Sequence, residues 1–410
     1  MRMLAFSAVV LLAASVALFG FGCGDGGDGG VDGGDGQTAD EHFADAMVEL
    51  QAELSDLDGD AYPWEWEADL TDALDDLEAA LDADPNHEGA LFMSALTRLA
   101  MVMMDPDLGD IMDGIFDGDD GPSGPRAPFF WYLEGPDPLF FLELARSDRP
   151  DDFPFSEMQA FIEGTVIPAL DYADDRLTRF EDLNGSFEIQ IVTEGKREVI
   201  VIDVDATDAY FLHAPLDAAQ ATSHALVTYN VDMEATQSLE ELLEDDPDFL
   251  TLRGGGHMPA AYDELLEMAG HLFEATVLLD AEVDAQGDDV FTKTAGYIPL
   301  EDEELFGPGA VDSLRIYAGR IEDALVDGLV INPGDYGGPS FDITVDFEQF
   351  FTNPMEDIRD YLPAHEVPWP DPDSTYIFRP IDLPDPTLNG FLPGMTDGMW
   401  EDLFQWVESD

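Results

Sequence analysis

The stretch TDALDDLEAALDADPNHEGALFMSAL, residues 71–96, carries two helical patterns separated by a short turn. Small and apolar residues recur at helical spacing on both sides of this turn. Ala73, Leu77 and Ala80 precede the turn, and Leu91 and Ala95 follow it. Pro85 ends the first helix and Asn86 turns the chain. Because small residues let two helices approach closely, this stretch predicts an antiparallel helical hairpin.

The same periodicity predicts helices over much of the rest of the chain. Residues 38–105 hold three of them, the second over 67–83 and the third over 87–104. Further helices are expected over 139–146, 156–183, 207–229, 237–244, 259–280 and 309–327. Ser156 and Gln159 form a candidate capping box at the start of the 156–183 helix, and Pro168 is expected to kink it.

Strand patterns are confined to two short stretches. SFEIQIVTEGKREVIVIDV, residues 186–204, alternates apolar and polar residues around a turn and predicts a β-hairpin. SFDITVDF, residues 340–347, is a candidate third strand for it. Residues 350–410 are proline-rich and end in a short amphipathic helix. The expected fold is mainly α: a helical-hairpin bundle with an inserted β-hairpin and an extended proline-rich C-terminal wrap.

The hairpin of residues 71–96 resembles the end of one tetratricopeptide repeat and the start of the next. This resemblance implies TPR-like packing within residues 38–105. Arg98 stands where the family prefers an aromatic residue, and no regular recurrence follows, so a full repeat array is not expected. An ordinary helical hairpin is the alternative.

The N-terminal region contains the only cysteine, Cys23. A basic start and an apolar run to Phe21 are typical of a secretory signal, and a Gly/Asp-rich stretch follows the cysteine. We therefore expect a signal peptide over residues 1–22, a flexible tether over 23–37 and a helical domain over 38–410.

Gly20-Phe21-Gly22-Cys23 resembles the lipobox of bacterial lipoproteins, although Gly20 and Phe21 depart from its usual pattern. The resemblance implies that Cys23 is lipidated, with palmitate among the attached acyl chains. It also implies that the lipid holds the chain at the cell envelope. Gly24 after the cysteine favours the outer membrane. The alternatives are an incidental cysteine in an ordinary cleaved signal and an uncleaved anchor. The whole pattern, with its NGFLPGMTDG tail, is similar to secreted lipoproteins of environmental bacteria, which implies no particular activity.

Acidic residues dominate the composition. The chain has 15 Lys and Arg against 91 Asp and Glu, a net charge of −76, and removal of residues 1–22 leaves 14 − 91 = −77. The spread of acid along the chain favours adaptation to a saline (halophilic) habitat, and specific binding of divalent cations is the alternative. A nucleic-acid partner is not expected because no basic patch exists. The hydrophobic content of 45% is sufficient for a sizeable core.

The best cation-binding pattern is DLDGDAYPWEWE, which lies between two predicted helices. Its acidic residues occupy positions 1, 3, 5 and 12 of an EF-hand loop: Asp56, Asp58, Asp60 and Glu67. Oxygen ligands at this spacing can hold calcium. Ala61 replaces the glycine that the sharp turn of such a loop requires, and a solvated linker is the alternative reading.

Two histidine pairs are weaker candidates for metal ligands. His271 and Glu274 share a helix face, and His213 and His224 are three turns apart on one helix. For each histidine the alternative is an ordinary position at the edge of the core. The catalytic motifs HExxH and GxSxG and the Walker loop are absent from the sequence.

These patterns together predict a lipid-anchored, exported, acidic helical protein that binds a protein or peptide in the cell envelope without enzymatic activity. An ion- or small-ligand-binding lipoprotein is the first alternative, and a hydrolase that uses carboxylates is the second.

The charge predicts a strong dependence of folding on salt. We expect the helical domain to unfold on dilution from molar salt, because the carboxylates then lose the counter-ions that screen their repulsion. Thermal unfolding followed by circular dichroism from low to molar NaCl measures this. A melting temperature that stays constant over this range would contradict salt adaptation.

Overall fold

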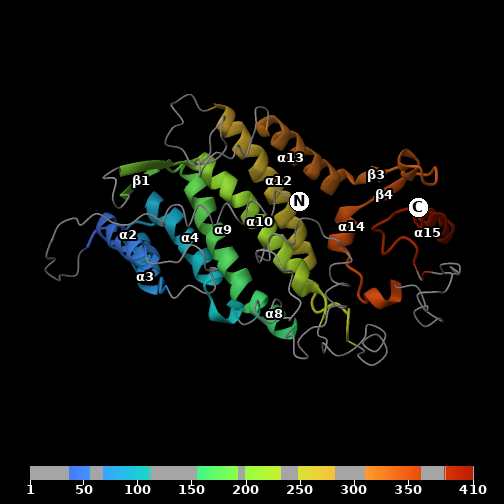
Figure 1. Ribbon diagram of the computed structural model, residues 1–410, viewed down its shortest axis with the longest axis horizontal. Helices are drawn as coiled ribbons and strands as arrows, with labels where there is room; N and C mark the ends of the chain where they lie inside the picture. The colour runs from blue at the N-terminus through green and yellow to red at the C-terminus, as the bar shows by residue number, and fades with distance from the viewer. Residues whose placement is uncertain are drawn as a thin grey trace.

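The computed structural model describes residues 37–55, 68–109, 111, 155–192, 199–231, 248–281, 310–361, 383 and 385–409. Over these ranges the protein is mainly helical with two small antiparallel pairs of strands, which confirms the predicted fold class. The long helices α9 (Ile167–Asp182), α10 (Ala206–Thr228) and α12 (His257–Ala281) form the centre of the molecule (Figure 1). The predicted helices at 139–146 and 237–244 lie outside the described residues.

The predicted helical hairpin is present. It consists of α3 (Thr71–Ala83) and α4 (Glu88–Met103), and α2 (Ala39–Ser55) packs beside α3 at the same end of the molecule (Figure 1). The small and apolar residues that predicted it are all buried: Ala73, Leu77, Ala80, Leu91 and Ala95. His87 caps α4, since its Nδ1 accepts a hydrogen bond of 3.1 Å from the backbone N–H of Ala90.

The next helical segment is interrupted, as Pro168 predicted. α8 (Phe155–Phe161) passes through a π-helical turn, η2 (Ile162–Val166), into α9. Pro168 has no N–H to donate and its ring crowds the carbonyl four residues earlier, which favours an irregular turn here, although α10 (Ala206–Thr228) continues through its own Pro215. The predicted capping box was wrong, because α8 already begins at Phe155 and Ser156 lies inside the helix.

The predicted β-hairpin is formed by β1 (Phe187–Val192) and β2 (Val199–Val204), which are antiparallel with Phe187 opposite Val204. The predicted third strand belongs to another sheet: β4 (Ile343–Val345) pairs with β3 (Leu329–Ile331). β3 is a close neighbour of β4 in the chain, so this pairing closes a much shorter loop than pairing with the distant hairpin would.

The C-terminal part packs around this second sheet. α13 (Ala310–Asp327) lies along α12 and leads into β3, while α14 (Phe347–Thr352) follows β4 (Figure 1). Two short 3-10 helices, η3 (Pro333–Tyr336) and η4 (Ile358–Tyr361), complete this region. The predicted terminal helix is α15 (Asp397–Ser409), and Leu392 and Met395 before it are buried against Val345 of β4.

α10 is largely buried, since both α9 and α12 pack on it. Its buried residues include a series of polar side chains: Thr207, Asp208, His213, Asp217, Gln220, Ser223 and Thr228. Within the described ranges, none of the helices combines the length and the apolar character needed to cross a membrane.

The turn that follows α9 gives a test of the packing. A Cβ at Gly185 would lie 2.6 Å from Cε2 of Phe180, whose ring is fully buried beside the ring of Phe92. We expect Gly185→Ala to lower the free energy of unfolding by about 1–3 kcal/mol because the ring cannot move aside. Chemical denaturation in molar salt measures it.

The matched control for this variant is Gly319→Ala inside α13, where a Cβ meets nothing within 4 Å. There alanine should raise stability by up to about 1 kcal/mol through its higher helix propensity. Equal stability of Gly185→Ala and the wild type would contradict the packing described for Phe180.

Candidate metal centre

Seven ionisable side chains from the three central helices gather in one place, which we call the histidine–carboxylate cluster. Its members are Asp174 and Glu181 of α9, His213 and Asp217 of α10, and Glu264, Glu267 and His271 of α12. Within each helix the members are three, four or seven residues apart, so each helix contributes them from a single face. The cluster therefore exists only because α9 and α12 both pack on α10.

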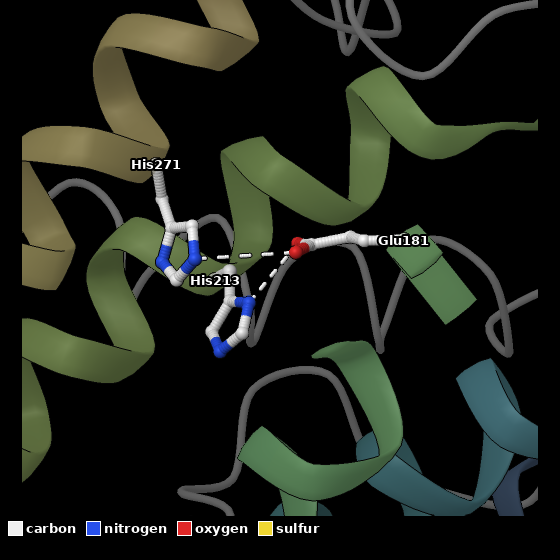
Figure 2. Close-up of side chains that lie close together, drawn as sticks. All are labelled: Glu181, His213 and His271. Atoms are coloured by element: carbon white, nitrogen blue, oxygen red, sulfur yellow. Dashed lines mark hydrogen bonds and ion pairs between the residues drawn. The ribbon is translucent and has the colours of Figure 1, made fainter. Parts of the chain in front are cut away.

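Two histidines and a glutamate form the core of the cluster (Figure 2). The rings of His213 and His271 are stacked, with centroids 4.0 Å apart and planes 15° apart. The carboxylate of Glu181 faces both: Oε1 lies 3.0 Å from Nδ1 of His213, and Oε2 lies 3.9 Å from Nε2 of His271. The side chain of His213 is fully buried, that of Glu181 is 6% exposed and that of His271 is 20% exposed.

Two aspartates complete the surroundings of the histidine rings. Asp174 Oδ1 lies 2.6 Å from Nε2 of His213. Asp217 Oδ2 lies 2.7 Å from Nδ1 of His271, and its Oδ1 is 3.6 Å from Nε2 of His213. Both ring nitrogens of His213 therefore face carboxylates.

The remaining part of the cluster consists of carboxylates alone. One oxygen from each of Asp217, Glu264 and Glu267 lies within 4.8 Å of the other two. Oδ1 of Asp217 and Oε2 of Glu264 are buried without a hydrogen-bond partner. Buried polar atoms are ordinarily satisfied, so these two oxygens require an explanation.

The cluster shifts the pKa values of its members. Burial disfavours the charged form of His213, but hydrogen bonds to Asp174 and Glu181 and the nearby charge of Asp217 outweigh it and raise the pKa to about 10. Burial and the positive charge of His213 lower the pKa of His271 to about 4. For Asp217 and Glu264, burial is the main cause that raises each pKa to about 8.

The cluster carries an excess of acid over base. It holds five carboxyl groups against two histidines, and of the histidines only His213 has a raised pKa. The arginine ion pairs found in the described part of the chain join other carboxylates: Glu78, Asp175, Glu163, Asp280 and Asp357. A group of imidazoles and carboxylates with this imbalance has the composition of a site for a divalent metal ion.

Most of the residues predicted as sites from the sequence lie outside the described residues. These are Cys23 and the four acidic residues of the EF-hand-like loop, Asp56, Asp58, Asp60 and Glu67. Lipidation and calcium binding at these positions stay predictions.

The histidine pairs were predicted with the wrong partners. Glu274 is exposed and is not a member of the cluster, and Glu267 on the preceding turn takes that place beside His271. His213 and His224 both contact α12, but His224 bonds instead to His257, with 2.9 Å between their Nδ1 atoms.

The five carboxylates of the cluster were not predicted. Their signal is the repeated spacing of acids and histidines on three separate helices, which only the packing of these helices combines. Comparisons with protein families, with curated proteins and with solved structures give no match. The case for a site therefore rests on the geometry of these helices.

Glu264 gives a test of the electrostatic cost of the cluster. In metal-free protein at neutral pH, Glu264→Gln should raise the free energy of unfolding by about 1 kcal/mol, because burial beside Glu267 and Asp217 raises the pKa of Glu264 to about 8 and its carboxyl must take up a proton on folding, which glutamine does not need. Thermal unfolding in the presence of a chelator measures it.

The control is Glu274→Gln, an exposed glutamate on the same helix, which should change stability by less than about 0.5 kcal/mol. A loss of stability in Glu264→Gln would show that the carboxylate stabilises the metal-free fold, contrary to this account.

Proposed function

We propose that the protein binds a divalent transition-metal ion between α9, α10 and α12. Glu181, His213 and His271 are the proposed ligands. The observation that carries the proposal is their convergence: one ligand atom from each lies within 4.8 Å of the others, and the Glu181 carboxylate faces both rings (Figure 2). Such a site is the ion-binding alternative among the functions predicted from the sequence.

The alternative, that His213 is an ordinary buried histidine with hydrogen-bond acceptors, explains only part of this cluster. His213 needs two acceptors when both its ring nitrogens carry protons, and Asp174 and Glu181 supply them. Three further carboxylates surround these groups: Asp217, Glu264 and Glu267. Crowding like charges in a buried place costs free energy unless cations compensate them, and a bound dication supports that balance.

The donor set favours particular ions. Imidazole nitrogens suit zinc, iron, nickel and copper, whereas calcium prefers a shell of oxygens only. The site is therefore expected to take Zn²⁺ or Co²⁺ in preference to Ca²⁺. Calcium binding is proposed only for the separate loop of Asp56–Glu67.

The cellular location of this site is a prediction from the sequence. We propose that the metal-binding body is exported and held at the envelope through a lipid on Cys23. Binding of an envelope protein or peptide, and hydrolysis by carboxylates, stay predictions from the sequence.

Metal titration of the full chain tests the proposal. Protein freed of metal with a chelator should bind Zn²⁺, and Co²⁺ should develop visible ligand-field absorption as imidazole nitrogens enter its coordination. The titrations belong in molar NaCl, because salt then screens the adventitious attraction of exposed carboxylates for cations.

The variant His271→Ala removes one ligand and should weaken Zn²⁺ binding by at least about 100-fold. The control is His42→Ala, since His42 of α2 has a similar exposure, 22% against 20%, lies beside Asp76 of α3 and does not belong to the cluster. Equal affinities of the two variants, or a wild type that binds neither ion, would contradict the proposed site.

A further inference from the structure

Each histidine of the proposed site presents one ring nitrogen to Glu181 and the other to an aspartate (Figure 2). For His213, Nδ1 lies 3.0 Å from Oε1 of Glu181, and Nε2 lies 2.6 Å from Oδ1 of Asp174. For His271, Nε2 lies 3.9 Å from Oε2 of Glu181, and Nδ1 lies 2.7 Å from Oδ2 of Asp217. The two stacked rings therefore face Glu181 through different nitrogens.

The lengths of these contacts distinguish the two sides of each ring. Two ligand atoms of a tetrahedral zinc ion, each about 2.0–2.1 Å from it, stand roughly 3.3 Å apart. The distances to Glu181, 3.0 and 3.9 Å, lie on either side of this separation, so small shifts of the side chains admit an ion there. The contacts to Asp174 and Asp217, 2.6 and 2.7 Å, are short hydrogen bonds with no room for an ion between their atoms.

The two aspartates match the hydrogen bonds that metal-bound rings must make. An imidazole that binds a metal through one nitrogen is neutral and carries its proton on the other. With an ion on Nδ1 of His213, the N–H at Nε2 donates to Asp174. With the same ion on Nε2 of His271, the N–H at Nδ1 donates to Asp217, whose side chain is fully buried. Each aspartate thus accepts the hydrogen bond that holds its ring in the metal-binding tautomer.

We infer that Asp174 and Asp217 are positioning residues of the metal site, which impose a mixed coordination: His213 binds through Nδ1 and His271 through Nε2. This inference rests on the proposed function, since it assigns the ligand atoms of that site and the groups that orient them. Neither aspartate touches the ion. By accepting from the rings, the two carboxylates also make the coordinating nitrogens more basic, so the affinity for metal depends on them as well as on the ligands.

Nuclear magnetic resonance of the full chain, labelled with ¹⁵N-histidine and loaded with Zn²⁺ in molar NaCl, tests the inference. Couplings between ring protons and ring nitrogens distinguish a metal-bound Nδ1 from a metal-bound Nε2, and one ring of each kind is expected. Asp217→Ala should alter the N–H signal of the ring bound through Nε2, and Asp174→Ala that of the ring bound through Nδ1. Each variant should weaken Zn²⁺ binding by about 10–100-fold.

Two further variants separate positioning from a general role in folding. Asp217→Asn keeps an oxygen that can accept from the N–H at Nδ1 of His271, so it should recover most of the affinity that Asp217→Ala loses. Asp175→Ala removes an exposed neighbour of Asp174 on the same helix, and it should leave the Zn²⁺ affinity and both N–H signals unchanged.

The other outcomes separate the inference from the proposal on which it rests. Two rings bound through the same kind of nitrogen, or an exchange of the rings that the two aspartate variants affect, overturn the inference and leave metal binding in place. Unchanged affinity in both alanine variants also overturns the inference alone. A wild type without a metal-bound ring nitrogen overturns the proposed function as well. If Asp217→Ala does not fold, the wild-type coordination and Asp174→Ala decide the same question.

Discussion

The structure depends on the burial of a helix that is not wholly apolar. α10 packs against α9 and α12, so the polar side chains that it buries must find their partners on those two helices. His213 takes Asp174 and Glu181 from α9, and Asp217 takes His271 from α12. These contacts fix how far each neighbour is shifted along α10, because a helix displaced by one turn would leave a buried charge unpaired.

The sequence predicted the positions of helices and strands better than it predicted which of them pack or pair together. Apolar periodicity predicted α4, α10, α12 and α13 to within a few residues, because each helix must bury one or more of its own faces. Residues 343–345 were identified as a strand but assigned to the wrong sheet, since alternation within a strand carries no information about its neighbour. An irregularity at Pro168 was expected from the sequence, but a proline alone does not decide its form, because α10 continues as an α-helix through Pro215.

The partners of the histidines were also missed because a sequence pattern does not show which helix packs against which. Spacing along one helix correctly brings His271 and the residues three or four positions away onto a common face, but both directions along the helix are equivalent in this respect. Packing on α10 selects the side of Glu267, and Glu274 remains exposed. Glu181 and Asp217 were beyond reach of sequence patterns, because any of the 91 acidic residues could have been the one that the fold brings to His213.

An acidic chain makes a metal site hard to recognise, and burial is what separates the two roles of its carboxylates. Exposed acids interact with diffuse counter-ions, and at molar salt the screening length falls to about 3 Å, so they compete little for a particular dication. The cluster differs from these acids, because Asp217 is fully enclosed and lies beside the rings of His213 and His271. In the proposed function, the net charge of −76 and the cluster therefore have different roles: the charge raises the local concentration of cations around the protein, and the proposed site selects among them by donor type. Salt suppresses the first effect and leaves the second, which is why affinity in molar salt reports on the cluster itself.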